Sequence, residues 1–233
     1  MKRIYKTVTV VATEDGGCSV LLDGRPLRSP GERALTLPSR ALAAAVAAEW
    51  DAQADRVDAR SMPMTGFTAT AVDRVTPQRD FVVGELAGYG GSDLLCYLAD
   101  EPAELTVRQE ATWRPLRDWA GATFGCRLLP TAGVMPVAQP PEALAALRRG
   151  VEAVGDWELA ALHTLTTLTG SLLLGLAVLH GRLDAEAAYA ASEIDEVYQA
   201  ELWGIDREAE QRRRARRAEA LEAAKFVELL RAG

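Results

Sequence analysis

The sequence has few of the residues that most often carry catalysis or bind metals. Among 233 residues there are only two histidines and three cysteines, Cys18, Cys96 and Cys126. The cysteines lie far apart and form no CxxC pair, which argues against a disulfide framework or a zinc site and indicates reduced thiols. The P-loop, the GxSxG nucleophile motif and the HExxH zinc motif are also absent. This composition gives little support to an enzyme.

Excess positive charge is absent too. The formal net charge is −7, so no overall basic field attracts nucleic acid or an anionic membrane. One basic run, RRRARR at 212–217, could suggest a nucleic-acid contact. However, Glu208 and Glu210 each stand four residues before an arginine, the favourable order for helical ion pairs, and Arg216 stands three before Glu219. The run is therefore interpreted as a solvated helix face with internal ion pairs, and we expect no nucleic-acid partner.

Only one segment is long and uncharged, the stretch LAALHTLTTLTGSLLLGLAVL at 159–179. Its length could span a bilayer, but His163, four threonines and two glycines lie within it. A buried pair of helices that turns near residues 169–171 is the better interpretation. The N-terminus alternates apolar and polar residues and lacks the continuous apolar core of a secretory signal. We therefore expect a cytoplasmic protein without stable membrane insertion.

The first forty residues have the two-residue period of β-strands. Apolar residues alternate with polar ones near residues 4–10, and a second strand leads to a hairpin turn at Asp23-Gly24. A short third strand is expected at residues 33–37. Together these strands predict a small antiparallel sheet.

From Ser39 onwards the period becomes helical. Ser39 is an expected N-cap, and helices are predicted after it, near residues 67–72 and at 78–89, with a loop at 58–65. Further helices are expected at 102–124 and 141–154, from Asp184 to Leu202 with one apolar stripe, and after Asp206. The glycine-rich stretch 88–93 marks a boundary. The predicted fold class is α+β: a β-rich N-terminal domain with helices over 1–90 and a larger all-helical bundle over 91–233.

The remaining candidates for chemistry are weak. His163 lies in the apolar helix, where a hydrogen-bonded core residue is commoner than a base or a ligand, and His180 precedes Gly181 at a helix end. The glycine-rich stretch lacks the third glycine and the βαβ frame of a dinucleotide site. The pair Met62 and Met64 could be an exposed contact surface, or a loop packed between the two parts of the protein.

Several short motifs, taken in order, resemble the ATP synthase assembly chaperone family that binds the unassembled alpha subunit of the catalytic head. The resemblance extends from about Val8 to Ala209. The motifs are LDGRPLRSP at 22–30, LPS with ALAAAVAAEWDAQ at 37–53, MPMT with TATAVDRV at 62–75, SDLLCYLADEPAEL at 92–105, RQEATWRPLRDWA at 108–120, TGSLLLGLAV at 169–178 and ELWGIDREA at 201–209.

The resemblance implies an ATP-independent chaperone with no cofactor, found in mitochondria or in alphaproteobacteria. From the composition and the missing motifs we expect no metal site and no catalytic residues. The family's important acidic position near the C-terminus matches Glu208 in the motif WGIDREA. Glu208 would be a hydrogen-bonding or ion-pairing contact to the alpha subunit. Asp206 is a weaker candidate, because its role as a helix N-cap already accounts for it. Trp50 matches an EWDxQ motif and is expected to be structural.

Two other classes of function stay open at this point. One is a small-molecule enzyme of unknown class that uses His163, which would require a deep pocket with an acidic or nucleophilic partner. The other is a generic protein-interaction module, or a nucleic-acid-binding module that uses the arginine run.

Overall fold

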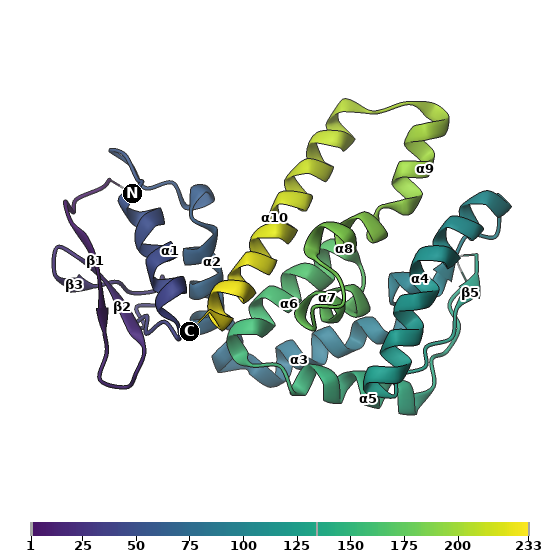
Figure 1. Cartoon of the computed structure of the whole chain (residues 1–233), viewed down its shortest axis with the longest axis horizontal. Helices are drawn as coiled ribbons and strands as arrows, with labels where there is room; N and C mark the ends of the chain where they lie inside the picture. The colour runs from purple at the N-terminus through teal and green to yellow at the C-terminus, as the bar shows by residue number, and fades with distance from the viewer. Residues whose placement is uncertain (1, 134, 233) are drawn as a thin grey trace. The chain divides into compact units, whose positions relative to one another are not determined.

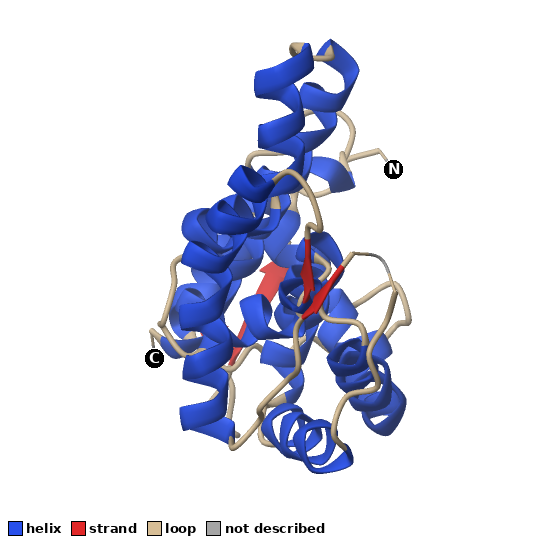
Figure 2. Ribbon diagram, turned by 90° about the vertical axis from the view of Figure 1, so that its right-hand side faces the viewer, coloured by secondary structure: helices blue, strands red, loops and turns tan. Residues whose placement is uncertain are grey.

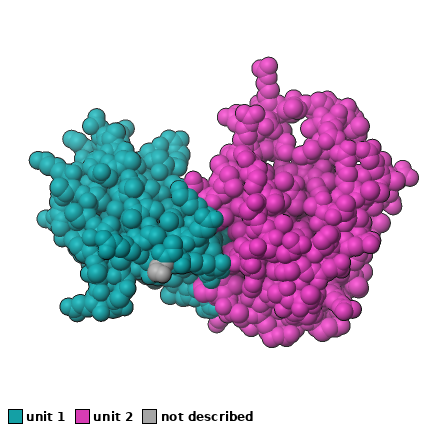
Figure 3. Space-filling view, in the orientation of Figure 1, with its two compact units in different colours: residues 1–79, 156–161, 225–233 teal, residues 80–155, 162–224 magenta. Residues whose placement is uncertain are grey.

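The computed structural model describes residues 2–133 and 135–232, and these form two compact units (Figure 3). Unit 1 consists of residues 1–79, 156–161 and 225–233, and unit 2 of residues 80–155 and 162–224. Unit 1 is therefore discontinuous in sequence and includes segments from the C-terminal half of the chain. These units are defined by contacts and do not test the predicted domain boundary between residues 90 and 91, which stays a prediction.

Unit 1 contains a three-stranded antiparallel sheet in the order β1 (Val8–Ala12), β2 (Cys18–Leu22) and β3 (Arg25–Pro26). Val10 lies opposite Val20, which is fully buried. The predicted hairpin turn is confirmed, since Asp23 and Gly24 both have positive φ, the backbone of a tight two-residue turn. The small antiparallel sheet predicted from the period is confirmed as well.

The expected third strand at residues 33–37 is wrong. This segment makes only isolated bridges, from Arg28 to Ala34 and from Cys18 to Leu37. Its polar groups have other partners: the backbone amide of Arg33 donates to the Ser29 hydroxyl, and the Arg33 guanidinium donates to the carbonyl of Val72. The segment is therefore held by isolated backbone hydrogen bonds, such as the pair between Cys18 and Leu37, together with these side-chain contacts, and not by a continuous ladder.

Two helices accompany this sheet, α1 (Arg40–Asp51) and α2 (Pro63–Thr70), and a π-helical turn at Ala71–Val75 continues α2 (Figure 1). The predicted cap is confirmed, because the Ser39 hydroxyl accepts from the backbone amide of Leu42. The predicted loop at 58–65 is too long by three residues. Pro63 begins α2 instead of preventing it, since a proline at the first helical position loses no hydrogen bond.

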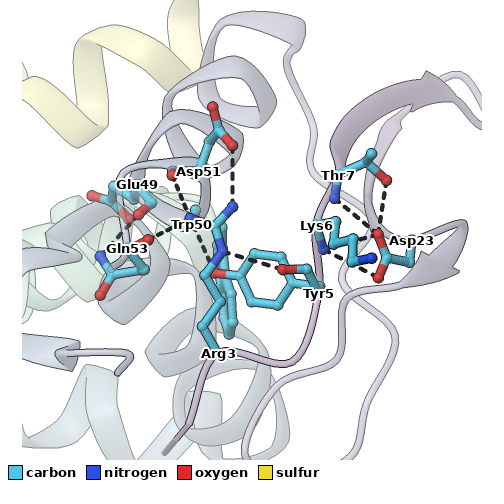
Figure 4. Close-up of polar contacts among 9 residues, drawn as sticks. All are labelled: Arg3, Tyr5, Lys6, Thr7, Asp23, Glu49, Trp50, Asp51 and Gln53. Atoms are coloured by element: carbon cyan, nitrogen blue, oxygen red, sulfur yellow. Dashed lines mark hydrogen bonds and ion pairs between the residues drawn. The ribbon is translucent and has the colours of Figure 1, made fainter. Parts of the chain in front are cut away.

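The EWDxQ motif at the end of α1 is structural, as expected. Glu49 accepts from the backbone amides of Met64 and Thr65 at 2.7 and 2.8 Å and so fixes the start of α2. The Trp50 carbonyl accepts from the Tyr5 hydroxyl at 2.6 Å (Figure 4). The same view shows Asp51 paired with Arg3. The motif thus connects α1 to the N-terminal segment and to α2.

Unit 2 is built mainly of helices, and strands are few throughout the ribbon (Figure 2). A two-stranded parallel pair, which the sequence did not predict, joins β4 (Tyr97–Leu98) to β5 (Thr131–Ala132). The helices from α3 onwards, three of which (α3, α6 and α10) also contribute residues to unit 1, are α3 (Arg79–Gly88), α4 (Ala103–Phe124), α5 (Pro141–Glu152), α6 (Asp156–Thr169), α7 (Leu172–Leu179), α8 (Ala185–Ser192), α9 (Ile194–Trp203) and α10 (Arg207–Arg231). The α+β fold class is confirmed.

The long uncharged segment forms the predicted pair of helices, α6 and α7. Gly170 turns the chain with φ +68°, and nearly all of α7 is buried. Gly175 allows the close approach, since a Cβ there would lie 2.8 Å from Leu162 Cδ1 and 2.9 Å from Thr166 Oγ1. Among the described residues, no helix has both the length and the apolar character needed to span a bilayer.

A buried carboxylate holds the start of α7. Asp93 is fully buried, and its oxygens accept from the Ser171 hydroxyl at 2.7 Å, the backbone amide of Leu173 at 3.0 Å and that of Leu95 at 3.1 Å. Burial raises the pKa of this carboxyl to about 6, against the lowering effect of the hydrogen bonds. Asp93 therefore joins two segments of unit 2 inside its core.

The helix predicted from Asp184 to Leu202 is wrong as one element. Asp184 does cap α8, but α8 ends at Ser192, and α9 begins at Ile194. The residue between them, Glu193, is buried, and its Oε2 forms an ion pair with Nε of Arg213 in α10 at 2.7 Å. This tertiary contact accompanies a break that periodicity alone could not show.

Candidate partner-binding surface

Three large apolar side chains are exposed where α9 meets α10. Leu202 is 56% exposed, Trp203 78% and Ile205 71%. We call residues 202–206 the α9–α10 corner; α9 leads up to it and α10 leads down from it, so both helices lie on the same side of the corner (Figure 1). The predicted single apolar stripe of this helix is wrong, because Tyr198 is buried while Leu202 faces solvent. A contiguous exposed apolar group of this kind is typical of an interaction surface.

The corner has a defined backbone. Gly204 ends α9 with φ +90° and ψ 169°, a conformation that is essentially restricted to glycine. Asp206 then starts α10, since one carboxylate oxygen accepts from the backbone amides of Glu208 at 2.7 Å and Ala209 at 3.1 Å. These bonds lower the pKa of Asp206, the Ala209 amide having the largest effect. The predicted helix corner and N-cap are both confirmed.

Glu208 lies in the first turn of α10, as predicted. Its side chain is 88% exposed, and its ion pair with Arg212 is long, at 3.8 Å, with Arg212 itself 68% exposed. An exposed pair at this distance contributes little to the stability of the fold. The carboxylate of Glu208 is therefore accessible to a partner, whereas Asp206 is already bound to the backbone.

The arginine run is mostly occupied within unit 2. Arg213 pairs with Glu193 and Glu210, Arg214 with Glu210 at 2.8 Å, and Arg217 with Glu186 at 2.7 Å. The predicted ion pairs of Glu208 and Glu210 with arginines four residues later are thus present. Arg216 donates instead to the carbonyl of Leu168, so the expected contact with Glu219 is replaced by one with α6.

A cleft of about 370 Å³ lies between α9 and α10, beside the corner. Glu196, Ala200 and Trp203 line it from one face of α9, and Ala209, Arg213 and Arg216 from one face of α10. The complete lining is Glu193, Glu196, Gln199, Ala200, Trp203, Gly204, Ile205, Asp206, Ala209, Glu210, Arg212, Arg213 and Arg216. We call it the α9–α10 cleft. Burial raises the pKa of the Glu196 carboxyl there.

None of the other candidate residues lines this cleft. His163 does not line the α9–α10 cleft, and His180 makes edge contacts with the rings of Trp119 and Phe124. Met62 and Met64 are buried, so the interpretation as an exposed contact surface is wrong. Met64 belongs to α2 rather than to a loop, and packing between the two parts of the chain stays a prediction. Over residues 2–133 and 135–232, no group of three His, Cys, Asp or Glu side chains is arranged to hold a metal ion.

Sequence reasoning found Asp206 and Glu208 but missed the apolar part of this surface. A signal was present, because Leu202, Trp203 and Ile205 are almost consecutive and interrupted only by Gly204. Side chains so close in sequence cannot all face one buried side of a helix. The cleft itself could not be predicted, since it depends on where α10 returns alongside α9.

An exposed apolar corner with an accessible carboxylate beside it is typical of a protein-interaction surface, and the comparisons with known proteins identify the class as a chaperone. The family model described as ATP12 chaperone protein matches residues 2–121, just over half of the chain. Atp12 from Paracoccus denitrificans is 46% identical, with a TM-score of 0.94 and 98% of each chain covered. The Atu1473 protein of Agrobacterium tumefaciens is 43% identical, with a TM-score of 0.91 over 99% of this chain and 85% of that one.

A curated eukaryotic relative is similar over much of its length as well. The mitochondrial protein atp12 of Schizosaccharomyces pombe is 25% identical over 215 residues, which are 87% of this chain and 74% of the relative. The chain therefore belongs to the ATP12 chaperone family, the ATP synthase assembly chaperones. The resemblance seen in the sequence motifs is confirmed.

Proposed function

We propose that this chaperone binds the free alpha subunit of the ATP synthase catalytic head and covers its apolar subunit interface until assembly. The observation that carries the proposal is the exposed apolar group of the α9–α10 corner, in a chain that belongs to a family of assembly chaperones. An unassembled subunit exposes apolar surface that would otherwise aggregate, and a holder needs apolar side chains of its own to cover it. The holding activity requires no nucleotide, cofactor or metal, and no catalytic step.

Glu208 is the proposed charged contact to the alpha subunit. Its exposure and its weak internal ion pair support this role, because little has to be broken before the carboxylate meets a cation of the partner. Asp206 is the second candidate, and its bonds to the backbone of α10 suggest that it acts by orienting Glu208. We further propose the bacterial cytoplasm as the site of action and no nucleic-acid partner.

The proposal is tested by the aggregation of purified, isolated alpha subunit, followed by light scattering with and without this protein and without nucleotide. We expect the wild-type protein to suppress aggregation and Glu208→Lys to be much weaker, since reversing the charge puts like charges in contact. Glu219→Lys is the matched control, because Glu219 is an exposed glutamate of the same helix, eleven residues further on.

The outcomes separate the parts of the proposal. If the wild-type protein leaves aggregation unchanged, the alpha subunit is not its client. If both lysine variants protect as well as the wild type, the alpha subunit remains the client but Glu208 is not a contact. Circular dichroism of each variant shows whether the fold is retained.

A further inference from the structure

The charged groups of the α9–α10 cleft are largely satisfied by one another. Arg213 is held by Glu193 and Glu210, and Arg216 by the carbonyl of Leu168. Asp206 is occupied by the backbone amides of α10. A small ion that entered the cleft would have to break these bonds. Breaking them costs free energy, which makes binding of such an ion unfavourable.

The apolar groups of the cleft, in contrast, have no such partners. The lining includes Ala200 and Ala209, together with the exposed side chains of Trp203 and Ile205 from the corner. A volume of about 370 Å³ is at the small end of the range of roughly 300–1000 Å³ for ligand pockets and suits an apolar side chain or two. The occupant that gains most from this cleft is therefore apolar.

The charge of the cleft indicates which kind of residue lies next to the apolar side chain of the partner. The cleft lining carries four carboxylates against three guanidinium groups. Glu208, which lies in the chain between the lining residues Asp206 and Ala209, adds an exposed carboxylate. This surface favours a cation over an anion at its rim.

We propose that the α9–α10 cleft receives an apolar side chain of the alpha subunit, next to a lysine or arginine of the same segment that pairs with Glu208. Trp203 and Ile205 supply most of the affinity, and Glu208 sets the register. A tryptophan in this position resembles the aromatic anchors that dominate binding energy in other interfaces, ringed by weaker polar contacts. The inference rests on the proposed function and adds to it the residues and the chemistry of the contact.

The test is the affinity of the intact protein for purified alpha subunit, measured by titration calorimetry or surface plasmon resonance. Trp203→Ala is expected to weaken binding by about tenfold or more, as for truncation of an interface anchor. Phe81→Ala is the matched control, because Phe81 of α3 is also a large exposed aromatic residue of unit 2, at 63% exposure. Its binding should stay within about twofold of the wild type.

Glu208→Gln tests the cation. It should reduce the rate of association and flatten the dependence of binding on salt, while Trp203→Ala mainly raises the rate of dissociation. Equal effects of both variants on the salt dependence would contradict the division of roles.

A photo-crosslinking amino acid in place of Trp203 gives a readout that does not depend on the stability of the alanine variant. The adduct with the alpha subunit should map to an apolar segment that contains or adjoins a lysine or arginine. Unchanged affinity of Trp203→Ala, or an adduct on an acidic or wholly polar segment, would overturn the inference while leaving the client as proposed. Failure of the wild-type protein to bind alpha subunit would instead reject the proposed function.

Discussion

Asp93 and Asp206 perform the same task in opposite surroundings. Each carboxylate accepts backbone amide hydrogens near the start of a helix, Asp93 at α7 and Asp206 at α10. Asp93 is fully buried and its pKa is raised to about 6, because burial penalises the charged form more than its hydrogen bonds favour it. Asp206 is exposed, and its pKa is lowered by hydrogen bonds of the same kind.

The comparison shows where stability and binding are separated in unit 2. The buried cap joins two segments of the core, so its loss disturbs packing and hydrogen bonding together. The exposed cap shapes only a corner, and water can replace part of what it does. A surface that must bind and release a partner is better built on the second kind, since its residues can change partners without unfolding the core.

The largest effect is expected from Asp93→Ala. The substitution leaves the amides of Leu95 and Leu173 and the hydroxyl of Ser171 without their acceptor inside the core. We expect the free energy of unfolding to fall by about 4 kcal/mol, several unsatisfied buried donors each costing about 1–3 kcal/mol. Urea denaturation followed by circular dichroism measures this free energy. An unchanged midpoint would contradict the stabilising role of the buried Asp93 hydrogen bonds.

A smaller effect should appear in the pH dependence of stability. Because the pKa of Asp93 is higher in the folded state than its ordinary value of 3.8, the folded state holds this proton more tightly. The contribution of Asp93 is therefore fully present below about pH 4 and is lost as the pH rises towards 6. Asp206, whose pKa is lowered, contributes in the opposite sense: its stabilisation is present above its ordinary value and is lost as the pH falls.

Denaturation curves between pH 3 and pH 7 check this pair of signs. In Asp93→Asn, the loss of stability between about pH 4 and 6 should be absent, so that the difference from wild type changes over that range. In Asp206→Asn, the difference from wild type should instead change only at the acidic end. The same dependence of the free energy of unfolding on pH in both variants would contradict the opposite signs expected for Asp93 and Asp206.

The smallest change in stability is expected from Asp206→Ala. Removing an exposed N-cap frays the first turn of α10 but leaves the ion pairs further along the helix, including that of Arg213 with Glu193. The melting temperature should fall much less than in Asp93→Ala. If Glu208 is the partner contact, binding of the alpha subunit should be affected more than stability, because Glu208 lies in the turn that frays.

Sequence reasoning located features that depend on local chemistry. The Asp23-Gly24 turn, the Ser39 and Asp206 caps and the turn at Gly170 were all predicted, because each residue type determines the backbone near it. Of the candidate site, the acidic residues came from a family motif, and their position in the first turn of α10 from the N-cap.

The failures have a common physical cause in contacts between distant residues. The break at Glu193 coincides with an ion pair to Arg213, twenty residues further on, and the exposure of Leu202 is set by where α9 ends. Residues 33–37 were expected to form a strand because their pattern alternates, but they make only isolated bridges, and Arg33 is held by contacts with Ser29 and Val72. Periodicity describes a segment by itself and contains no information on these partners.

The discontinuous composition of unit 1 affects the order in which the nascent chain can fold. Its sheet, α1 and α2 leave the ribosome first, yet Phe67 stacks on Phe226 and the Ser39 hydroxyl donates to the carbonyl of Leu229. At about 5–20 residues per second, translation needs on the order of ten seconds or more to pass from the first segment of this unit to its last. The sheet, α1 and α2 are therefore synthesised early, but unit 1 is completed only when its last segment has been made. Until then the apolar surface of these elements is exposed, as is that of an unassembled subunit.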